Sequence, residues 1–166
     1  LGGVSKWLGH MLDRKLAQFK HLAFCAEHVI DALNTTPFDK DCVLIHWDLD
    51  DFFMKGSHRF LVQHAGLMLP IAVRRLGRAV LEFVLQNQYV TSSLVPGAFR
   101  QVEGSGQGLP HSGSIANIAF LHSCELMGPA LASTATHERF GIQCYIRYVD
   151  NLFFVCKRNW ASIRAL

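Results

Sequence analysis

The hydrophobic positions of the first half of the chain predict helices around one buried strand. Residues 4–33 carry scattered charges among apolar positions and predict a helix, whereas 34–41, NTTPFDKD, has the composition of a loop. The run 42–53, CVLIHWDLDDFF, predicts a buried strand that leads into acidic residues. A further helix is expected from 56–66, GSHRFLVQHAG, with Ser57 as its N-cap.

The second half alternates a broken helix, a loop-rich stretch and two closing strands. Pro70 interrupts the helix, which then continues to about Gln88. Residues 91–114 are rich in Gly, Ser and Pro and predict strand ends and loop, and an apolar helix follows over 114–133. Four apolar residues recur at helical spacing after Pro70 and predict a buried face: Val73, Leu76, Val80 and Phe83.

The segment 141–157, GIQCYIRYVDNLFFVCK, predicts a tight β-hairpin with Asp150-Asn151 at its tip. A simple polar turn is one interpretation of that pair. The interleaved strands and helices predict an α+β fold, with a small antiparallel sheet backed by helices on one side.

Composition narrows the class of protein only a little. Half of the 166 residues are hydrophobic and 17% are charged, which indicates a globular chain. The net charge of +3 is compatible with a polyanionic partner without requiring one. Five cysteines without a CxxC pair favour reduced thiols in an intracellular setting, nuclear or cytoplasmic. No apolar run is long enough to span a membrane, so no membrane partner is expected.

Two acidic positions could act together. Asp48 follows the first strand, and Asp150 lies at the tip of the hairpin. Carboxylates from neighbouring strand ends can hold two divalent cations about 3.5–4 Å apart, the arrangement used for nucleotidyl transfer. Hard oxygen ligands point to Mg²⁺ or Mn²⁺. Between the two acids lies GQGLPHSGSIANIAF, where glycines allow close approach of the backbone to a ligand and a helix begins.

The order of these segments resembles the palm domain of reverse transcriptases. VLIHWDLDDFF is similar to the first palm motif, QGLPHSGSIANIAF to the second and RYVDNLFFV to the third. The resemblance implies a polymerase palm at 42–166, with motifs at 43–54, 104–120 and 145–155, and a partial fingers or N-terminal helical region at 1–41. The stretch FRQVEGSGQGLPHSGSIAN, together with Glu125, is similar to Penelope-like retroelements.

The resemblance also implies the roles of individual residues. The metal ions would be held by Asp48, Leu49 (through its carbonyl), Asp150 and Asn151, with Asp48 and Asp150 as the catalytic pair. The nucleotide would be bound by Asp51, Phe53 (which blocks a ribose 2′-hydroxyl), Gln107, Gly108 and Ser112. The implied partners are an RNA template, a DNA primer and deoxynucleoside triphosphates.

This chain departs from the family pattern at two positions. Most members have a second aspartate where Asn151 stands, and a proline where Gly113 stands. Negative-strand viral RNA polymerases work with Asp-Asn at the equivalent turn, so activity is compatible with Asn151. The loss of one negative charge is expected to weaken metal binding or to shift the preference toward Mn²⁺.

The resemblance covers about two-thirds of the chain and implies incomplete fingers and no thumb, because few residues follow the third motif. The start at Leu1 and the ending NWASIRAL lead us to expect a fragment of a larger, retroelement-derived protein. Two other interpretations stay open. One is a decayed palm that only binds nucleic acid or serves as a structural module. The other is a phosphohydrolase of the haloacid dehalogenase type, with Asp48 as nucleophile and Asp50 as acid/base.

Overall fold

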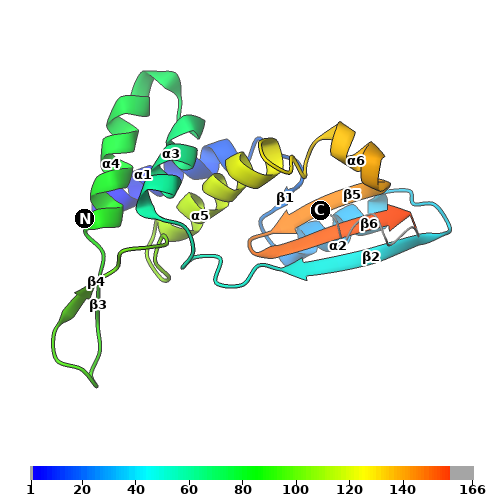
Figure 1. Ribbon diagram of the computed structural model, residues 1–166. Coiled ribbons are helices and arrows are strands. Elements are labelled where there is room, and N and C mark those ends of the chain that lie inside the picture. Colours follow the sequence, from blue (N-terminus) through cyan, green and yellow to red (C-terminus); the bar gives the residue numbers. More distant parts are fainter. Residues whose placement is uncertain (1, 158–166) are drawn as a thin grey trace. The chain divides into compact units, whose positions relative to one another are not determined.

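The computed structural model describes residues 2–157 and shows an α+β fold, as expected (Figure 1). Within that range there are six α-helices, a four-stranded sheet and a two-stranded sheet. In chain order the elements are α1 (Gly2–Leu16), β1 (Leu22–Ala23), α2 (Ala26–Thr35), β2 (Cys42–Asp48), α3 (His58–Met68), the 3₁₀ turn η1 (Ile71–Val73), α4 (Arg74–Gln86), β3 (Tyr89–Thr91), β4 (Ala98–Arg100), α5 (Ser112–Phe120), the π-helix η2 (Leu121–Leu126), α6 (Thr134–Phe140), β5 (Ile142–Tyr148) and β6 (Asn151–Lys157).

The chain forms two compact units, and each is discontinuous in sequence. The helical unit contains residues 1–18 and 51–122, and the sheet unit contains residues 19–50 and 123–166. The chain therefore passes from one unit to the other three times. The C-terminal residues, on which the expectation of a missing thumb rests, include 158–166, which lie outside the described range.

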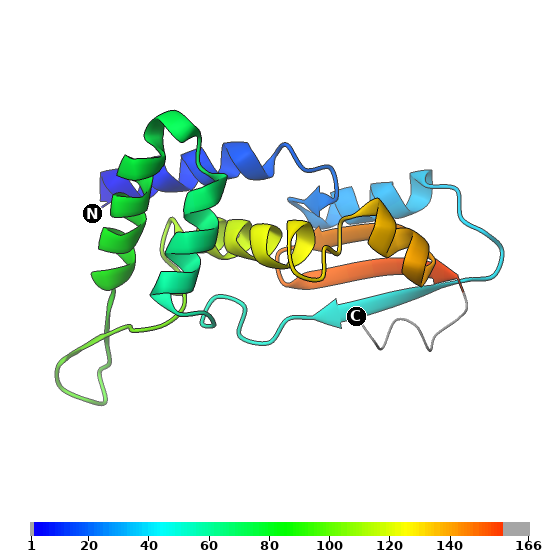
Figure 2. The ribbon, with the colours of Figure 1, turned by 45° about the horizontal axis from the view of Figure 1, so that its top comes forward.

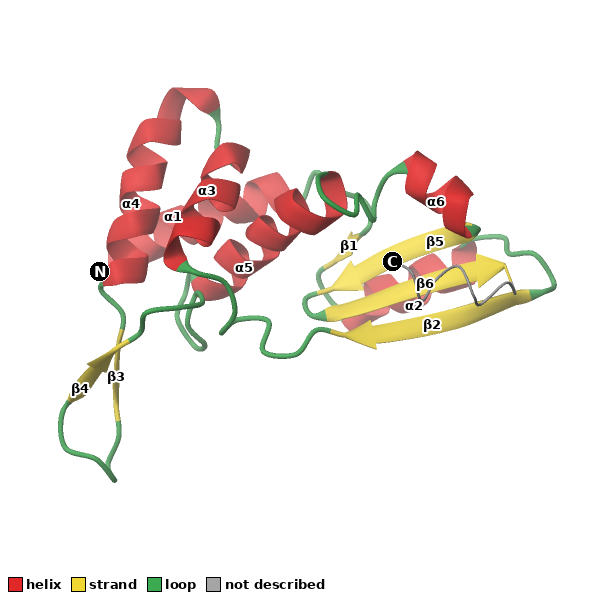
Figure 3. Ribbon diagram, in the orientation of Figure 1, coloured by secondary structure: helices red, strands yellow, loops and turns green. Residues whose placement is uncertain are grey.

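The four-stranded sheet has the order β1-β5-β6-β2 (Figure 3). The pairs β2–β6 and β5–β6 are antiparallel, and the predicted hairpin over 141–157 is confirmed. Its two-residue turn is Val149-Asp150, however, and not the predicted Asp150-Asn151, because Asn151 is already paired with Tyr148. The sheet is nevertheless mixed rather than purely antiparallel, because Leu22 and Ala23 pair in parallel with β5. A strand of two residues carries too little periodicity to be predicted from sequence.

The two faces of this sheet are covered by different elements. Ile146 points toward α2 and packs with Val29 and Ala23, and Figure 2 shows α2 lying across that face. Tyr145 points to the opposite face, where its ring stacks on Phe154 and meets His137 of α6 edge-on. The expectation that helices back only one side is therefore wrong. Strands buried on both faces read as continuous apolar runs, which hide the second layer.

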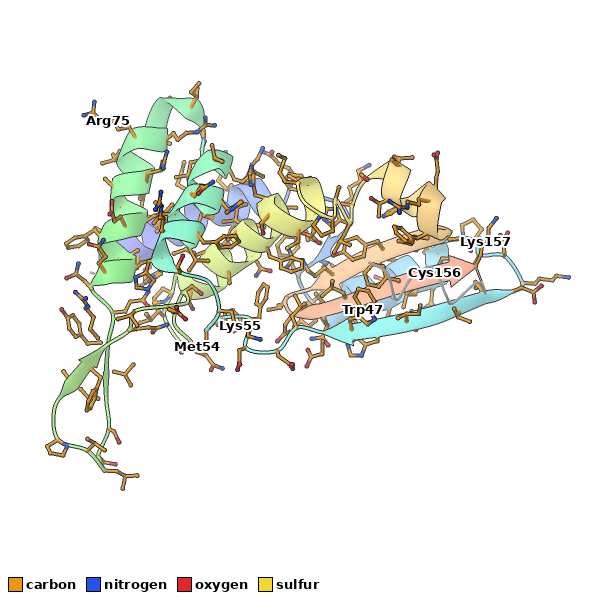
Figure 4. The ribbon with its side chains drawn as sticks, in the orientation of Figure 1. Trp47, Met54, Lys55, Arg75, Cys156 and Lys157 are labelled. Atoms are coloured by element: carbon orange, nitrogen blue, oxygen red, sulfur yellow. The ribbon has the colours of Figure 1, made fainter. Side chains whose placement is uncertain are left out.

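β2 forms an edge of the described sheet, and its outward side is less covered. Trp47 packs edge-on against Phe154, and Figure 4 shows Trp47 on β2 with Cys156 and Lys157 at the end of the neighbouring strand. Leu44 points to the other face and is 58% exposed. β2 is therefore packed on the face of Trp47 and more exposed on the face of Leu44, and it ends at Asp48.

The predicted helix over residues 4–33 is wrong in its middle. α1 ends at Leu16, β1 follows, and α2 begins only at Ala26. The backbone N–H of Arg147 donates to the carbonyl of His21 (2.8 Å), so the pairing with β5 holds this stretch extended. A tertiary contact thus overrides the local pattern.

The break between the next two helices is confirmed. Ser57 caps α3 by accepting from the N–H of Phe60 (3.2 Å), and Pro70 separates α3 from η1 and α4. The buried face of α4 was not predicted correctly, because Leu76 is 61% exposed and Phe83 is 52% exposed. The buried positions are Gly77, Leu81, Val84 and Leu85.

Gly77 helps to explain why the buried face of α4 differs from the predicted one. A Cβ atom at this position would lie 2.4 Å from Cδ1 of Leu69, so the glycine admits a close approach of that side chain. A hydrophobic pattern that scores only large apolar residues passes over such a position.

The helical unit also carries an exposed β-ribbon. β3 and β4 pair antiparallel and project from the helices (Figure 1), with every residue from 89 to 100 exposed. This agrees with the strand ends and loop expected over 91–114, except that α5 already begins at Ser112. Among the helices of residues 2–157, none is long and apolar enough to cross a bilayer.

Candidate functional site

The two catalytic candidates lie on adjacent strand ends of the sheet unit. Asp48 is the last residue of β2 and is exposed, and its register partner in β6 is Asn151. Asp150 is the second residue of the two-residue turn between β5 and β6. Directly opposed residues of an antiparallel pair have Cβ atoms about 4.5–5.5 Å apart. The structure therefore brings Asp48 beside the Asp150-Asn151 pair, although these residues are 102 or more positions apart.

The backbone of the turn is held by two hydrogen bonds. The N–H of Leu49 donates to the carbonyl of Asp150 (2.9 Å), which joins the end of β2 to the turn. Arg147 Nη1 donates to the carbonyl of Val149 (2.9 Å). Val149 has a φ of 55°, although a β-branched residue strongly disfavours that region. The strained turn is thus fixed from both sides.

Side chains around the turn also contact one another. Asn151 Nδ2 donates to Asp150 Oδ1 (2.8 Å), and His46 Nε2 lies 2.7 Å from Asn151 Oδ1. His46 is not among the residues predicted from the sequence to form the site. A period-2 count back from Asp48 would have placed it on the same face of β2.

A buried ion pair lies on the other face of this sheet. Glu125 is 0% exposed and Arg147 is 1% exposed, and the guanidinium contacts both carboxylate oxygens at 3.0 Å. The Tyr145 hydroxyl donates to Glu125 Oε1 (2.5 Å). Because Arg147 also bonds to Val149, this network connects the interior of the sheet unit to the turn.

Burial alone would raise the pKa of Glu125, but its partners lower that pKa to about 2. The lowering comes from hydrogen bonding by His21, from the charge and hydrogen bonds of Arg147, and from Tyr145. His21 Nε2 is 3.4 Å from Glu125 Oε1, too long for a well-formed hydrogen bond, whereas Arg147 Nε lies 3.0 Å from the same oxygen. Burial and the neighbouring carboxylate raise the pKa of Tyr145. Glu125 is therefore ionised and Tyr145 neutral at neutral pH.

Both partners of this pair could have been flagged from sequence. Arg147 interrupts an apolar strand, and Glu125 interrupts an apolar helix. Charged residues in such runs are buried only when they are paired. The structure gives Arg147 such a partner, the Glu125 carboxylate.

The five nucleotide-binding candidates lie in the other, helical unit. Asp51 is exposed, has a φ of 54°, and its carbonyl accepts from the N–H groups of Met54 (2.8 Å) and Lys55 (3.0 Å). Phe53 is half-buried, and its carbonyl accepts from the N–H of Ser105 (2.8 Å). The segment after Asp51 is therefore tied to the glycine-rich loop.

Of the nucleotide-binding candidates in that loop and at the start of α5, two are exposed and one is buried. Gln107 and Gly108 are exposed, and Gly108 has a φ of 82°. Ser112 is buried, and its hydroxyl donates to the carbonyl of Leu109 (2.8 Å). Gly113, where the family has proline, follows in the first turn of α5, and a Cβ there would lie 3.9 Å from the Phe53 ring. Within this unit, Phe53 and the start of α5 are thus neighbours.

A buried polar pair supports the loop from inside. Gln88 Nε2 donates to the carbonyl of Ser105 (3.0 Å) and lies 3.0 Å from His111 Nε2. Burial lowers the pKa of His111, so its imidazole is neutral at neutral pH. A neutral Nε2 that faces an amide N–H₂ acts as an acceptor. His111 is therefore a structural residue of the loop.

The donor set at the turn suits a hard cation that keeps open positions. Across residues 2–157, no group of three or more His, Cys, Asp or Glu side chains could hold a metal ion on its own. Two carboxylates and nearby carbonyl and amide oxygens remain at the turn. Mg²⁺ is commonly bound by one or two carboxylates, with substrate phosphates and water completing its shell. The residues present fit such an ion.

No protein-family model matches the chain, and the search of curated proteins finds no match to it either.

Proposed function

We propose that this chain is the palm of an RNA-directed DNA polymerase of the reverse transcriptase type, with a lean to the Penelope-like retroelements. The observation that carries the proposal is the register of β2 and β6, which puts Asp48 beside the Asp150 turn. The proposed family rests on the three sequence motifs that resemble those of reverse transcriptases. The glycine-rich loop, which leads into α5 and is bonded to Phe53, gives further support.

In this proposal Asp48 and Asp150 hold the metal ions, with the Leu49 carbonyl and the Asn151 side chain close by. Two bound Mg²⁺ ions would supply activation of the primer 3′-hydroxyl and charge neutralisation at the leaving pyrophosphate. The chain itself contributes position: the bonds to Leu49, Arg147 and Asn151 fix the turn before any ligand arrives. Preorganised charge of this kind lowers the barrier without reorganisation during the reaction.

The nucleotide contacts are carried over from the resemblance. Phe53 would exclude a ribose 2′-hydroxyl, and Asp51 would face the triphosphate side. Gln107 and Gly108, both exposed, would contact the nucleotide or template, and the buried Ser112 would shape the loop through Leu109. Because a polymerase must accept every sequence, these contacts are expected to read shape and backbone.

The test is primer extension on an RNA template by the full-length protein, in Mg²⁺ and separately in Mn²⁺. Asp150→Ala should reduce extension by more than about 10³-fold, because it removes one of two metal-binding carboxylates. Asn151→Asp should strengthen extension in Mg²⁺. Asp50→Ala is the matched control, since Asp50 is an exposed carboxylate two positions from Asp48. If the full-length wild-type protein gives no extension and Asn151→Asp gives none either, the assignment of Asp48 and Asp150 as catalytic residues is wrong.

A decayed palm is the second candidate, and Asn151 favours it. The amide of Asn151 donates to Asp150 Oδ1, so this carboxylate has a hydrogen-bond partner within the chain itself. Fluorescence anisotropy with an RNA–DNA hybrid would then show salt-dependent binding in the absence of extension. The phosphohydrolase alternative needs a later phosphate-binding lysine and a second acidic pair at a strand end, and the sequence shows no evident candidate for either.

A further inference from the structure

The side-chain amide of Asn151 has one possible orientation between its two neighbours. One end lies 2.8 Å from Asp150 Oδ1 and the other lies 2.7 Å from His46 Nε2. The N–H₂ group faces Asp150, because Nδ2 donates and the carboxylate oxygen accepts. The carbonyl oxygen of the amide therefore faces His46, and Nε2 of that imidazole must carry a hydrogen.

His46 is itself held in place. It pairs with Phe153 in the β2–β6 register, and the two rings stack with centroids 4.9 Å apart and planes 17° apart. The stack restricts the imidazole to the face of the sheet that also carries Asp48 and Asn151. Although His46 is exposed, its ring thus has both a stacking partner and a hydrogen-bond partner.

The backbone bonds of the turn do not fix the Asp150 carboxylate. Leu49 and Arg147 bond to main-chain carbonyls of the turn and leave the side-chain torsions of Asp150 free to rotate. Asn151 supplies a side-chain bond to Asp150 Oδ1. The orientation of this carboxylate is therefore set from His46 through Asn151.

We propose that His46 is a positioning residue, which holds the Asn151 amide and through it the Asp150 carboxylate. As a statement about catalysis, this inference rests on the proposed polymerase function. It gives Asn151 a role besides metal binding, because its amide donates to Asp150. Asn151→Asp would lose this hydrogen bond, so the stronger extension expected of that variant requires the added negative charge to outweigh the loss. The chain gives up one negative charge and gains a carboxylate that is oriented before metal binds.

The test compares two substitutions of His46. His46→Phe keeps an aromatic ring to stack on Phe153 but removes the hydrogen-bond donor, whereas His46→Gln keeps a donor. Nuclear magnetic resonance of the ¹⁵N-labelled chain reports the Nε2–H tautomer of His46 and the side-chain amide of Asn151. Primer extension by the full-length variants reports kcat and KM. His10→Phe is the control, because His10 is exposed on α1.

We expect His46→Phe to shift the Asn151 side-chain amide resonances and to lower kcat about tenfold, with KM for the nucleotide nearly unchanged, because misplacement of a catalytic group acts on the chemical step. His46→Gln should restore most of both, and His10→Phe should change neither. Unchanged Asn151 resonances in His46→Phe would overturn the proposal. So would shifted resonances with an unchanged kcat, or failure of His46→Gln to rescue.

Failure of the proposed function gives a different result. If the wild-type protein shows no extension, binding of Mn²⁺ alone, followed by electron paramagnetic resonance, replaces kcat as the second readout. Weaker Mn²⁺ binding in His46→Phe, restored in His46→Gln, would support the positioning role without polymerase activity. Equal Mn²⁺ binding in all variants would overturn it.

Discussion

The glycine-rich loop over 104–108 and the hairpin turn at Val149–Asp150 both use positive φ, but they reach it differently. In the loop, Gly104, Gly106 and Gly108 have φ values of 73°, 78° and 82°. Glycine adopts this region without steric cost, so the loop follows from its own sequence. In the turn, Val149 has a φ of 55° and no glycine is present.

The backbone conformation of the loop is determined by its own glycines, whereas that of the turn is determined by contacts with the rest of the sheet unit. The strained turn persists because bonds from outside it, from Leu49 and Arg147, together with two flanking strands, outweigh the local cost of about 1–3 kcal/mol. The loop also bonds to Gly56, Phe53 and Gln88, but its glycines leave no comparable strain for these bonds to offset. The turn therefore depends on the tertiary structure of the sheet unit, and its conformation should respond to changes in the buried network behind it.

The largest effect is expected from breaking that network. Arg147→Met should lower the free energy of unfolding by about 3–5 kcal/mol, because it leaves the Glu125 carboxylate buried and unpaired. Lys157→Met is the matched control, since Lys157 pairs with Asp39 at 3.3 Å on the surface, with both side chains more than half exposed. That change should stay within about 1 kcal/mol. Urea denaturation followed by circular dichroism measures both, and equal effects would contradict the assigned role of the buried pair.

Low pH should also weaken the Glu125–Arg147 ion pair, because it protonates the Glu125 carboxylate. The folded-state pKa of Glu125, about 2, lies below its ordinary value of 4.5, so the folded state binds fewer protons than the unfolded state. The stabilisation is complete above pH 4.5 and is lost as the pH falls toward 2, on the order of 3 kcal/mol in total.

Denaturation at a series of pH values, with Glu125→Gln beside the wild type, measures this contribution. The variant should be less stable at neutral pH and should lose less stability between pH 4.5 and 2. Parallel pH profiles for the two proteins would show that Glu125 does not titrate as inferred.

In the glycine-rich loop, Gly104→Ala should cost about 2–3 kcal/mol, from the positive φ together with a clash. A Cβ at this position would lie 2.5 Å from the carbonyl oxygen of Phe53 and 2.6 Å from the Cα of Met54, both backbone atoms. Gly108→Ala is the control, because a Cβ there meets nothing within 4 Å. It should show only the smaller conformational cost. Thermal unfolding separates the two, and equal losses would mean that close packing contributes nothing at Gly104.

The smallest effect, of opposite sign, is expected from relieving the turn. Val149→Gly should stabilise the protein by about 1 kcal/mol, because glycine accepts the positive φ. Val90→Gly, at an exposed position of β3, should destabilise instead, since glycine weakens a strand. Thermal unfolding gives the sign of each change. If Val149→Gly destabilises the protein, the side-chain contacts of Val149 contribute more to stability than its backbone strain costs.

Sequence reasoning was most successful where one local signal dominates. The Ser57 cap, the break at Pro70 and the hairpin over 141–157 each depend on a few neighbouring residues, and each is confirmed. It was wrong where distant contacts decide. Leu22 and Ala23 become a strand only because β5 is available, and the buried face of α4 is set by Leu69 against Gly77.

The candidate site divides in the same way. Asp48 and Asp150 stand out by their position after apolar strands, and the register places them together. Strand periodicity places His46 on the face of Asp48, but its contacts could not be predicted, because its partners Phe153 and Asn151 are far away in sequence. The side-chain bond of Ser112 to Leu109 was likewise beyond reach, since a serine at a helix start can point to solvent, to a ligand or to its own loop.

The long separation between β2 and β6 has a consequence for synthesis on the ribosome. His46 and Asn151 are 105 positions apart, so β2 leaves the ribosome well before its partner strand exists. At about 5–20 residues per second, this delay lasts roughly 5–20 s. During that time the apolar segment CVLIHWD has an unpaired edge, the kind of surface that chaperones bind and that promotes aggregation. We expect the yield of folded protein to be sensitive to translation speed over residues 51–150, even where the final stability is unchanged.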